Sequence, residues 1–201
     1  VTEEMPSVRS AALGFMIGAG SIGEQHSEAG LSHLVEHLIF RGTQNFSSLE
    51  IDETFDSMGA EINAGTGKES TALYSRVLDE HLPRAFEVMS DMVWRPTCAD
   101  VDPERDVILE EIAMYEDDPQ DKIFDVLGEA VFSDHPLGRA VIGRAEVVSD
   151  TPAGEIAAFH AARYGPANIV IAAAGSVDHD ALVAQAEQLV PARGATPPPA
   201  A

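Results

Sequence analysis

Residues 31–39 read LSHLVEHLI, a short segment with helical periodicity. Its large apolar side chains recur at spacings of three and four: Leu31, Leu34, Val35, Leu38 and Ile39. This spacing predicts a helix, beginning at position 27 or 30, with one apolar face directed into a core. On such a helix His33 and His37 are one turn apart on a common face, and Glu36 stands beside them.

Two imidazoles one turn apart can bind a single metal ion, and an adjacent carboxylate can serve as a base. The order H-x-x-E-H at residues 33–37 reverses the H-E-x-x-H motif of zinc peptidases. We predict a zinc site at His33 and His37, with Glu36 as general base. The alternative is an amphipathic helix with two surface histidines, which the coincidence of the motif with the apolar pattern disfavours.

Two histidines leave a catalytic zinc ion short of its usual three protein ligands. A second predicted helix, residues 103–116, carries Glu104, Glu110 and Glu111. Glu104 and Glu111 are about two turns apart and share a face, whereas Glu110 is rotated by about 100° from Glu111. Glu111 therefore fits a third ligand and Glu104 a carboxylate that orients a ligating histidine or the bound water. Glu110 stays open as an alternative ligand.

Composition excludes several classes of protein. The 201 residues are 45% hydrophobic, which is enough for a sizeable core, and the formal net charge is −22. Such an acidic surface repels phosphates, so nucleic acids and anionic membranes are poor partners. A single cysteine, Cys98, excludes a disulfide scaffold, and the apolar runs are too short to span a membrane.

Strands and helices are predicted without strict βαβ alternation, so the fold class is α+β, with a mixed, largely antiparallel sheet covered by helices. The predicted strands are residues 8–17, 61–66, 71–77 and 168–174, the middle two forming a hairpin. Besides the two above, helices are predicted over residues 48–58, 82–94, 120–132 and 178–189. A further helix is predicted to have Pro152 in its first turn and to end at Tyr164. Four phenylalanines in helical patterns are predicted to lie in the core: Phe40, Phe55, Phe86 and Phe124. His160 is predicted to be a surface residue, and Cys98 a buried thiol.

A series of motifs resembles the pitrilysin/insulinase family (M16) of inverted-motif zinc metalloendopeptidases, which includes the β subunit of mitochondrial processing peptidase. The first of these motifs is residues 33–43, and the resemblance as a whole spans about Thr2 to Val190. It continues in family order through Asn63-Ala64, Lys68 to Tyr74, Glu104 to Ile108, Glu110 to Ile112, His135 to Gly138 and Ile142-Gly143. It implies a pitrilysin-like domain that holds one Zn²⁺ and hydrolyses peptides or unfolded protein segments.

The resemblance also implies roles for individual residues. His33 and His37 match the zinc-binding histidines, and Glu36 matches the catalytic base. The distal glutamate ligand matches Glu111, 74 positions after His37, and Glu104 matches an additional glutamate two turns earlier.

The family's substrate-pairing strand matches Asn63 and Ala64, an edge-strand mode of peptide recognition. Residues 1–190 would then be an N-terminal catalytic half that lacks a first strand before Val1. Residues 191–201 would be a Pro/Ala-rich linker toward a second domain or partner subunit that supplies further substrate-binding residues. A homodimer is a further expectation.

Two other functions compete with a peptidase. A catalytically silent structural subunit of the same family would not need an intact set of ligands beside a base. S-ribosylhomocysteine lyase uses a similar motif, but with a cysteine ligand and a second catalytic cysteine, which a chain with Cys98 alone cannot supply. The excess of arginine over lysine suggests a bacterial source, and we expect a cytoplasmic location.

Overall fold

The computed structural model describes residues 1–98 and 100–191, so the predicted linker beyond residue 191 lies outside the described chain. One five-stranded sheet has the order β1-β5-β2-β4-β3. Its strands are β1 Thr2–Glu4, β2 Ser10–Ile17, β3 Glu61–Thr66, β4 Thr71–Leu78 and β5 Ile169–Gly175. Only β1 and β5 pair in parallel, and the other pairs are antiparallel. The predicted α+β class and the largely antiparallel sheet are confirmed.

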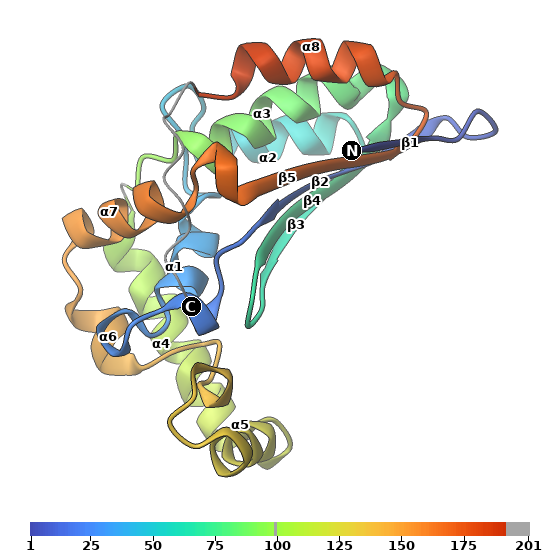
Figure 1. Ribbon diagram of the computed structural model, residues 1–201. Helices are drawn as coiled ribbons and strands as arrows, with labels where there is room; N and C mark the ends of the chain where they lie inside the picture. The colour runs from blue at the N-terminus through green and yellow to red at the C-terminus, as the bar shows by residue number, and fades with distance from the viewer. Residues whose placement is uncertain (99, 192–201) are drawn as a thin grey trace.

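The helices form two groups (Figure 1). Three cover one face of the sheet: α2 Ser48–Ser57, α3 Leu82–Trp94 and α8 His179–Leu189. The others lie beyond the end of the sheet: α1 Leu31–Leu38, α4 Val101–Asp117, α5 Pro119–Phe132, α6 Ala145–Asp150 and α7 Ala153–Arg163. Within the described chain, no helix combines the length and the apolar character that a membrane crossing requires.

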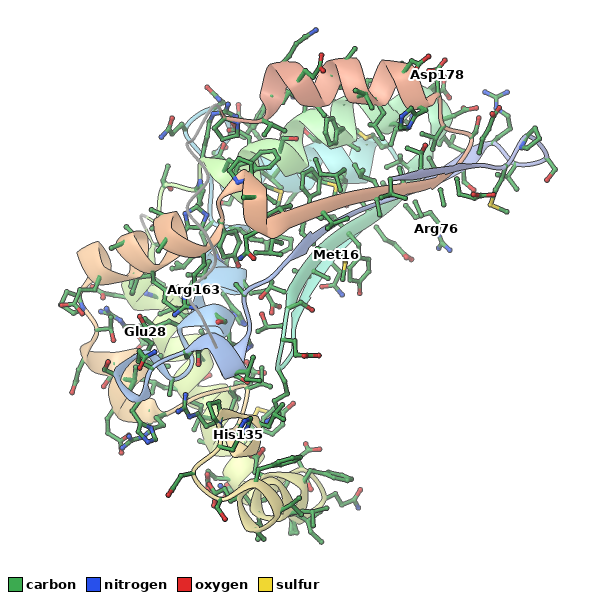
Figure 2. All side chains as sticks on the ribbon, in the orientation of Figure 1. Met16, Glu28, Arg76, His135, Arg163 and Asp178 are labelled. Carbon is green, nitrogen blue, oxygen red and sulfur yellow. The ribbon has the colours of Figure 1, made fainter. Side chains whose placement is uncertain are left out.

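The core lies between the sheet and the helices on its covered face. Alternate residues of β2 are fully buried there, while Met16 on the opposite face is exposed. Phe15 stacks on Phe86 of α3 with ring centroids 5.6 Å apart, and Trp94 meets the same ring edge-on at 5.7 Å. Figure 2 shows Met16 and Arg76 on the uncovered side of the sheet. The helices thus cover one face of the sheet and supply the other half of the core.

The start of α1 is fixed by a close contact between two backbones. Gly30, the N-cap, has φ +104°, and a Cβ added to Gly143 would lie 2.2 Å from the Gly30 Cα. The buried carboxylate of Glu24 accepts hydrogen bonds from the backbone N–H groups of Gly30 and Ser32 at 2.9 and 2.7 Å. Two N–H groups of the first turn that no helical carbonyl can reach are thereby satisfied.

Several element boundaries differ from the prediction. The strand predicted from residue 8 begins at Ser10, and β1 was not predicted, because its three polar residues carry no apolar alternation. The predicted start of the helix with Pro152 in its first turn was wrong. A separate short helix, α6, ends at Asp150, and the extended Pro152 is the N-cap of α7.

The predictions of burial were confirmed only in part. Phe55 and Phe86 are buried, and Phe40 packs partly against the core, but Phe124 on α5 is 70% exposed, so its predicted core position was wrong. His160 is buried and its Nε2 lies 2.9 Å from the Val93 carbonyl oxygen, contrary to the predicted surface position. Cys98 is only half-buried, and that burial raises the pKa of its thiol.

We predict that Gly143→Ala destabilises the protein by about 2–3 kcal/mol, because the new methyl group forces the backbone at Gly30 to move. Urea unfolding of the full-length protein measures this. Gly154→Ala is the matched control. Gly154 is in α7, and a Cβ added there would have no tertiary neighbour within 4 Å among the described residues. The control should change stability by less than about 1 kcal/mol, favourably if at all. Equal effects of the two substitutions would contradict the proposed backbone contact.

Candidate metal centre

Helices α1 and α4 bring the three predicted ligands together. The Nε2 atoms of His33 and His37 lie 3.7 and 3.9 Å from Oε2 of Glu111. One ligand atom from each residue can be chosen so that all lie within 4.8 Å of one another. Glu110 is exposed and is not part of this cluster. The geometry therefore favours Glu111 over Glu110 as a third ligand.

The cluster suits a zinc ion in both chemistry and size. Two imidazole nitrogens and a carboxylate oxygen are ligands that Zn²⁺ accepts. In a tetrahedral site with bonds near 2.0 Å, ligand atoms lie about 3.3 Å apart, so the two imidazoles and the Glu111 carboxylate would each move inward slightly to hold the ion. Burial, together with the neighbouring His37, lowers the pKa of His33, which keeps its imidazole neutral and able to ligate.

Glu36 lies on the same turn of α1 as the two histidines. Its Oε2 atom is buried and has no hydrogen-bond partner among the described residues. A shielded oxygen with a free lone pair is suited to accept a proton from a water molecule. Tyr164 is fully buried nearby, and burial, with a smaller contribution from the charge of Glu36, raises the pKa of its hydroxyl.

Glu104 lies behind His37, as the sequence predicted. Its carboxylate is buried, and Oε2 lies 3.2 Å from Nδ1 of His37. The other oxygen, Oε1, lies 2.6 Å from Nε of Arg41. Sequence reasoning missed Arg41. The only signal was its position in the LIFRGT stretch after the histidines, and that position does not predict a contact with a glutamate 63 positions later.

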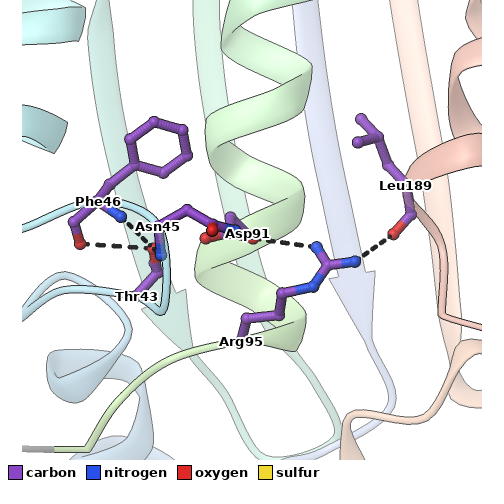
Figure 3. Close-up of polar contacts among 6 residues, drawn as sticks. All are labelled: Thr43, Asn45, Phe46, Asp91, Arg95 and Leu189. Atoms are coloured by element: carbon purple, nitrogen blue, oxygen red, sulfur yellow. Dashed lines mark hydrogen bonds and ion pairs between the residues drawn. The ribbon is translucent and has the colours of Figure 1, made fainter.

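The loop that follows Arg41 is fastened to the end of α3 (Figure 3). Asp91 accepts hydrogen bonds from Asn45 Nδ2 and Arg95 Nη1, both at 3.0 Å. Arg95 also donates to the Leu189 carbonyl oxygen at 3.2 Å. Thr43 Oγ1 accepts hydrogen bonds from the backbone N–H groups of Asn45 and Phe46. These bonds fix the chain immediately beyond the metal-bearing helix.

The predicted substrate-pairing residues lie on an edge strand. β3 pairs only with β4 on one side and contacts α1. Asn63 is exposed and Ala64 is half-buried, and the Ala64 N–H donates to Oδ1 of Asn63 at 2.8 Å. The unpaired side of β3 therefore presents backbone groups close to the helix that carries His33.

A cavity of about 410 Å³ opens beside the ligands. Its lining combines the metal cluster, two acidic residues of α5, aromatic and apolar residues, and one lysine: His33, Glu111, Asp121, Asp125, Tyr115, Phe124, Val141, Ile142, Thr66 and Lys68. The Lys68 ammonium donates to the Arg139 carbonyl oxygen, so it is already engaged. Asp121 and Asp125 were missed from sequence, because aspartates on a helix ordinarily belong to its solvated face.

Family models match almost the whole chain. The insulinase model, peptidase family M16, matches residues 1–145, and the model of the M16 inactive domain matches residues 152–200. A protein of Mycobacterium tuberculosis described as an uncharacterized zinc protease is 47% identical over 186 residues, which are 92% of this chain and 42% of that protein. The zinc protease YmxG of Bacillus subtilis is 39% identical, over 88% of this chain and 44% of its own length.

Solved structures share the fold. A protease from Helicobacter pylori superposes with a TM-score of 0.92 at 21% identity, covering 99% of this chain and 50% of that one. The first half of the periplasmic protease PqqL from Escherichia coli gives a TM-score of 0.86 at 25% identity, covering 98% and 45% of the two chains. The chain thus spans about half the length of the relatives it matches.

We predict that Glu111→Gln weakens zinc binding by at least tenfold in the full-length protein, because a neutral amide is a poorer ligand than a carboxylate. Glu110→Gln, one position earlier and exposed, should leave the zinc dissociation constant unchanged. Competition with a chromophoric chelator measures both. If Glu110→Gln caused the larger loss, the assignment of the third ligand would be reversed.

Proposed function

The chain belongs to the insulinase family, peptidase family M16, and from this premise we propose that it is the catalytic half of a zinc-dependent endopeptidase. Its substrates would be peptides or unfolded protein segments, and residues 1–190 would form the N-terminal half. One observation carries the proposal: two histidines of α1 and a glutamate of α4 meet within 4.8 Å, beside a carboxylate whose buried oxygen has no hydrogen-bond partner in the described part of the chain.

The mechanism follows from what each residue can do. A zinc ion held by His33, His37 and Glu111 would supply a Lewis acid that acidifies water and polarises a peptide carbonyl. Glu36 accepts the proton of the attacking water at Oε2 and later returns a proton to the leaving amine, so that one carboxylate acts first as base and then as acid. Glu104 holds His37 through Nδ1, which leaves Nε2 facing Glu111.

Substrate recognition is proposed to use the edge strand and the acidic cavity. An extended peptide paired with β3 at Asn63 and Ala64 would run past α1 and place its scissile bond near the ligands. Asp121 and Asp125 would favour a basic side chain in the adjoining cavity, where Phe124 supplies apolar contact. Further substrate contacts would come from a second domain or subunit, and homodimerisation and a cytoplasmic location stay predictions.

A silent structural subunit is the competing function. The family model named for an inactive domain matches residues 152–200, but the candidate ligands, Glu36 and Glu104 all lie within residues 1–145, the part matched by the insulinase model. A scaffold gains nothing from Glu36, whose buried Oε2 has no hydrogen-bond partner within residues 1–98 and 100–191, at a cost in folding free energy. This unpaired oxygen favours the enzyme over the scaffold.

We predict that Glu36→Gln retains stoichiometric zinc but lowers peptide hydrolysis by at least 10³-fold, because an amide cannot accept the proton of water. Metal analysis and a quenched fluorogenic peptide assay on the full-length protein measure the two properties. Turnover at the wild-type rate would overturn the role of Glu36. Loss of zinc together with activity would instead show that Glu36 supports the metal site.

Replacing both Asp121 and Asp125 with asparagine should lower kcat/KM about tenfold for a peptide with arginine near the cleaved bond, since two partly exposed ion pairs are lost. A matched peptide with glutamine should be unaffected. Glu129→Gln on the same helix, outside the cavity lining, is the control variant. Equal losses for both peptides would exclude charge recognition at this cavity.

A further inference from the structure

We propose that Arg41 is a positioning residue of the metal centre, which it controls through Glu104. Arg41 contacts no candidate ligand directly, but it holds the carboxylate that holds His37. The inference rests on the proposed zinc site. It adds a residue from outside the H-x-x-E-H motif whose side chain determines how firmly one ligand is preorganised.

The two oxygens of Glu104 are divided between the two partners. Oε1 lies 2.6 Å from the Arg41 guanidinium, and Oε2 lies 3.2 Å from His37 Nδ1. The Glu104 side chain is only 4% exposed, so water cannot readily replace a missing partner. A buried carboxylate without a cation nearby is strongly unfavourable, and the guanidinium compensates for this burial.

This division fixes the tautomer of His37. An ionised carboxylate only accepts hydrogen bonds, so the proton of the neutral imidazole belongs on Nδ1. The lone pair of Nε2 is then free on the side that faces Glu111 at 3.9 Å. His33 has no equivalent support, because its Nδ1 is buried without a hydrogen-bond partner among the described residues. Of the two histidines, His37 is therefore the preorganised ligand.

The local backbone allows Arg41 to reach Glu104. Helix α1 ends at Leu38, and the Arg41 N–H donates to the Leu38 carbonyl oxygen at 3.0 Å, which continues the turn. Gly42 follows with φ +112°, a conformation that favours glycine, and the chain then enters the loop fastened by Asp91 (Figure 3). The Arg41 side chain is 46% exposed, so its ion pair rather than burial holds it in place.

The test measures zinc affinity in the full-length protein, where Arg41→Gln should weaken binding about five- to tenfold. Arg41→Lys should restore part of the loss, because the ammonium keeps the charge but not the planar geometry. The control is Arg9→Gln, which breaks an equally direct arginine–carboxylate pair of 2.7 Å with Asp79, where the arginine is exposed. It should leave affinity unchanged. Unchanged affinity in Arg41→Gln would overturn the proposal.

A double-mutant cycle separates positioning from a general electrostatic effect. If Arg41 acts through Glu104, then Arg41→Gln should cost little in a Glu104→Gln background, whereas additive losses would overturn the proposal. Nitrogen-15 NMR of the metal-free protein gives a second readout: His37 should carry its proton on Nδ1, and Arg41→Gln should mix the tautomers. Unmixed tautomers would also count against it. Absence of zinc binding by the wild type would instead refute the proposed function.

Discussion

The contact between His37 and the buried Glu104 joins residues that lie 67 positions apart in the chain, and the geometry of the metal centre depends on it. On one side, α1 is held by its apolar face, by the Glu24 carboxylate and by the close approach of Gly30 to Gly143. On the other side, α4 presents a carboxylate that needs a cation and a proton donor. A shift of either helix would leave a buried charge unpaired, so packing and electrostatics select the same arrangement.

The acidic residues of this fold fall into two groups, one at the metal centre and one on the exposed surface. Glu36, Glu104 and Glu111 lie on two facing helices, where their negative charges would oppose folding if nothing offset them. Arg41 neutralises Glu104 within the chain, and a divalent cation would offset the remaining two. Most other carboxylates are exposed, where screening by salt makes each of them nearly neutral for stability.

Sequence reasoning succeeded where local periodicity and chemistry coincide. The spacing of residues 31–39 predicted α1, and two-turn spacing on α4 predicted the shared face of Glu104 and Glu111, whereas the ligand roles of His33, His37 and Glu111 stay predictions. It failed where a tertiary partner decides. Arg41 acquires its role only through a glutamate on another helix, and α5 has the pattern of a core helix although none of its described residues is buried. His160 likewise faces Val93, which no local pattern indicates.

The ion pair between Glu28 and Arg163, two residues labelled in Figure 2, has a consequence for the order of assembly. It closes a loop of 135 positions and ties α7 to the segment that leads into α1. A chain emerging from the ribosome displays both histidines long before Arg163 is made. Loop closure over such a length is slow relative to helix formation. An isolated helix of eight residues is only marginally stable in water, so the histidine helix is stabilised in its final position only when the last third of the domain has been made.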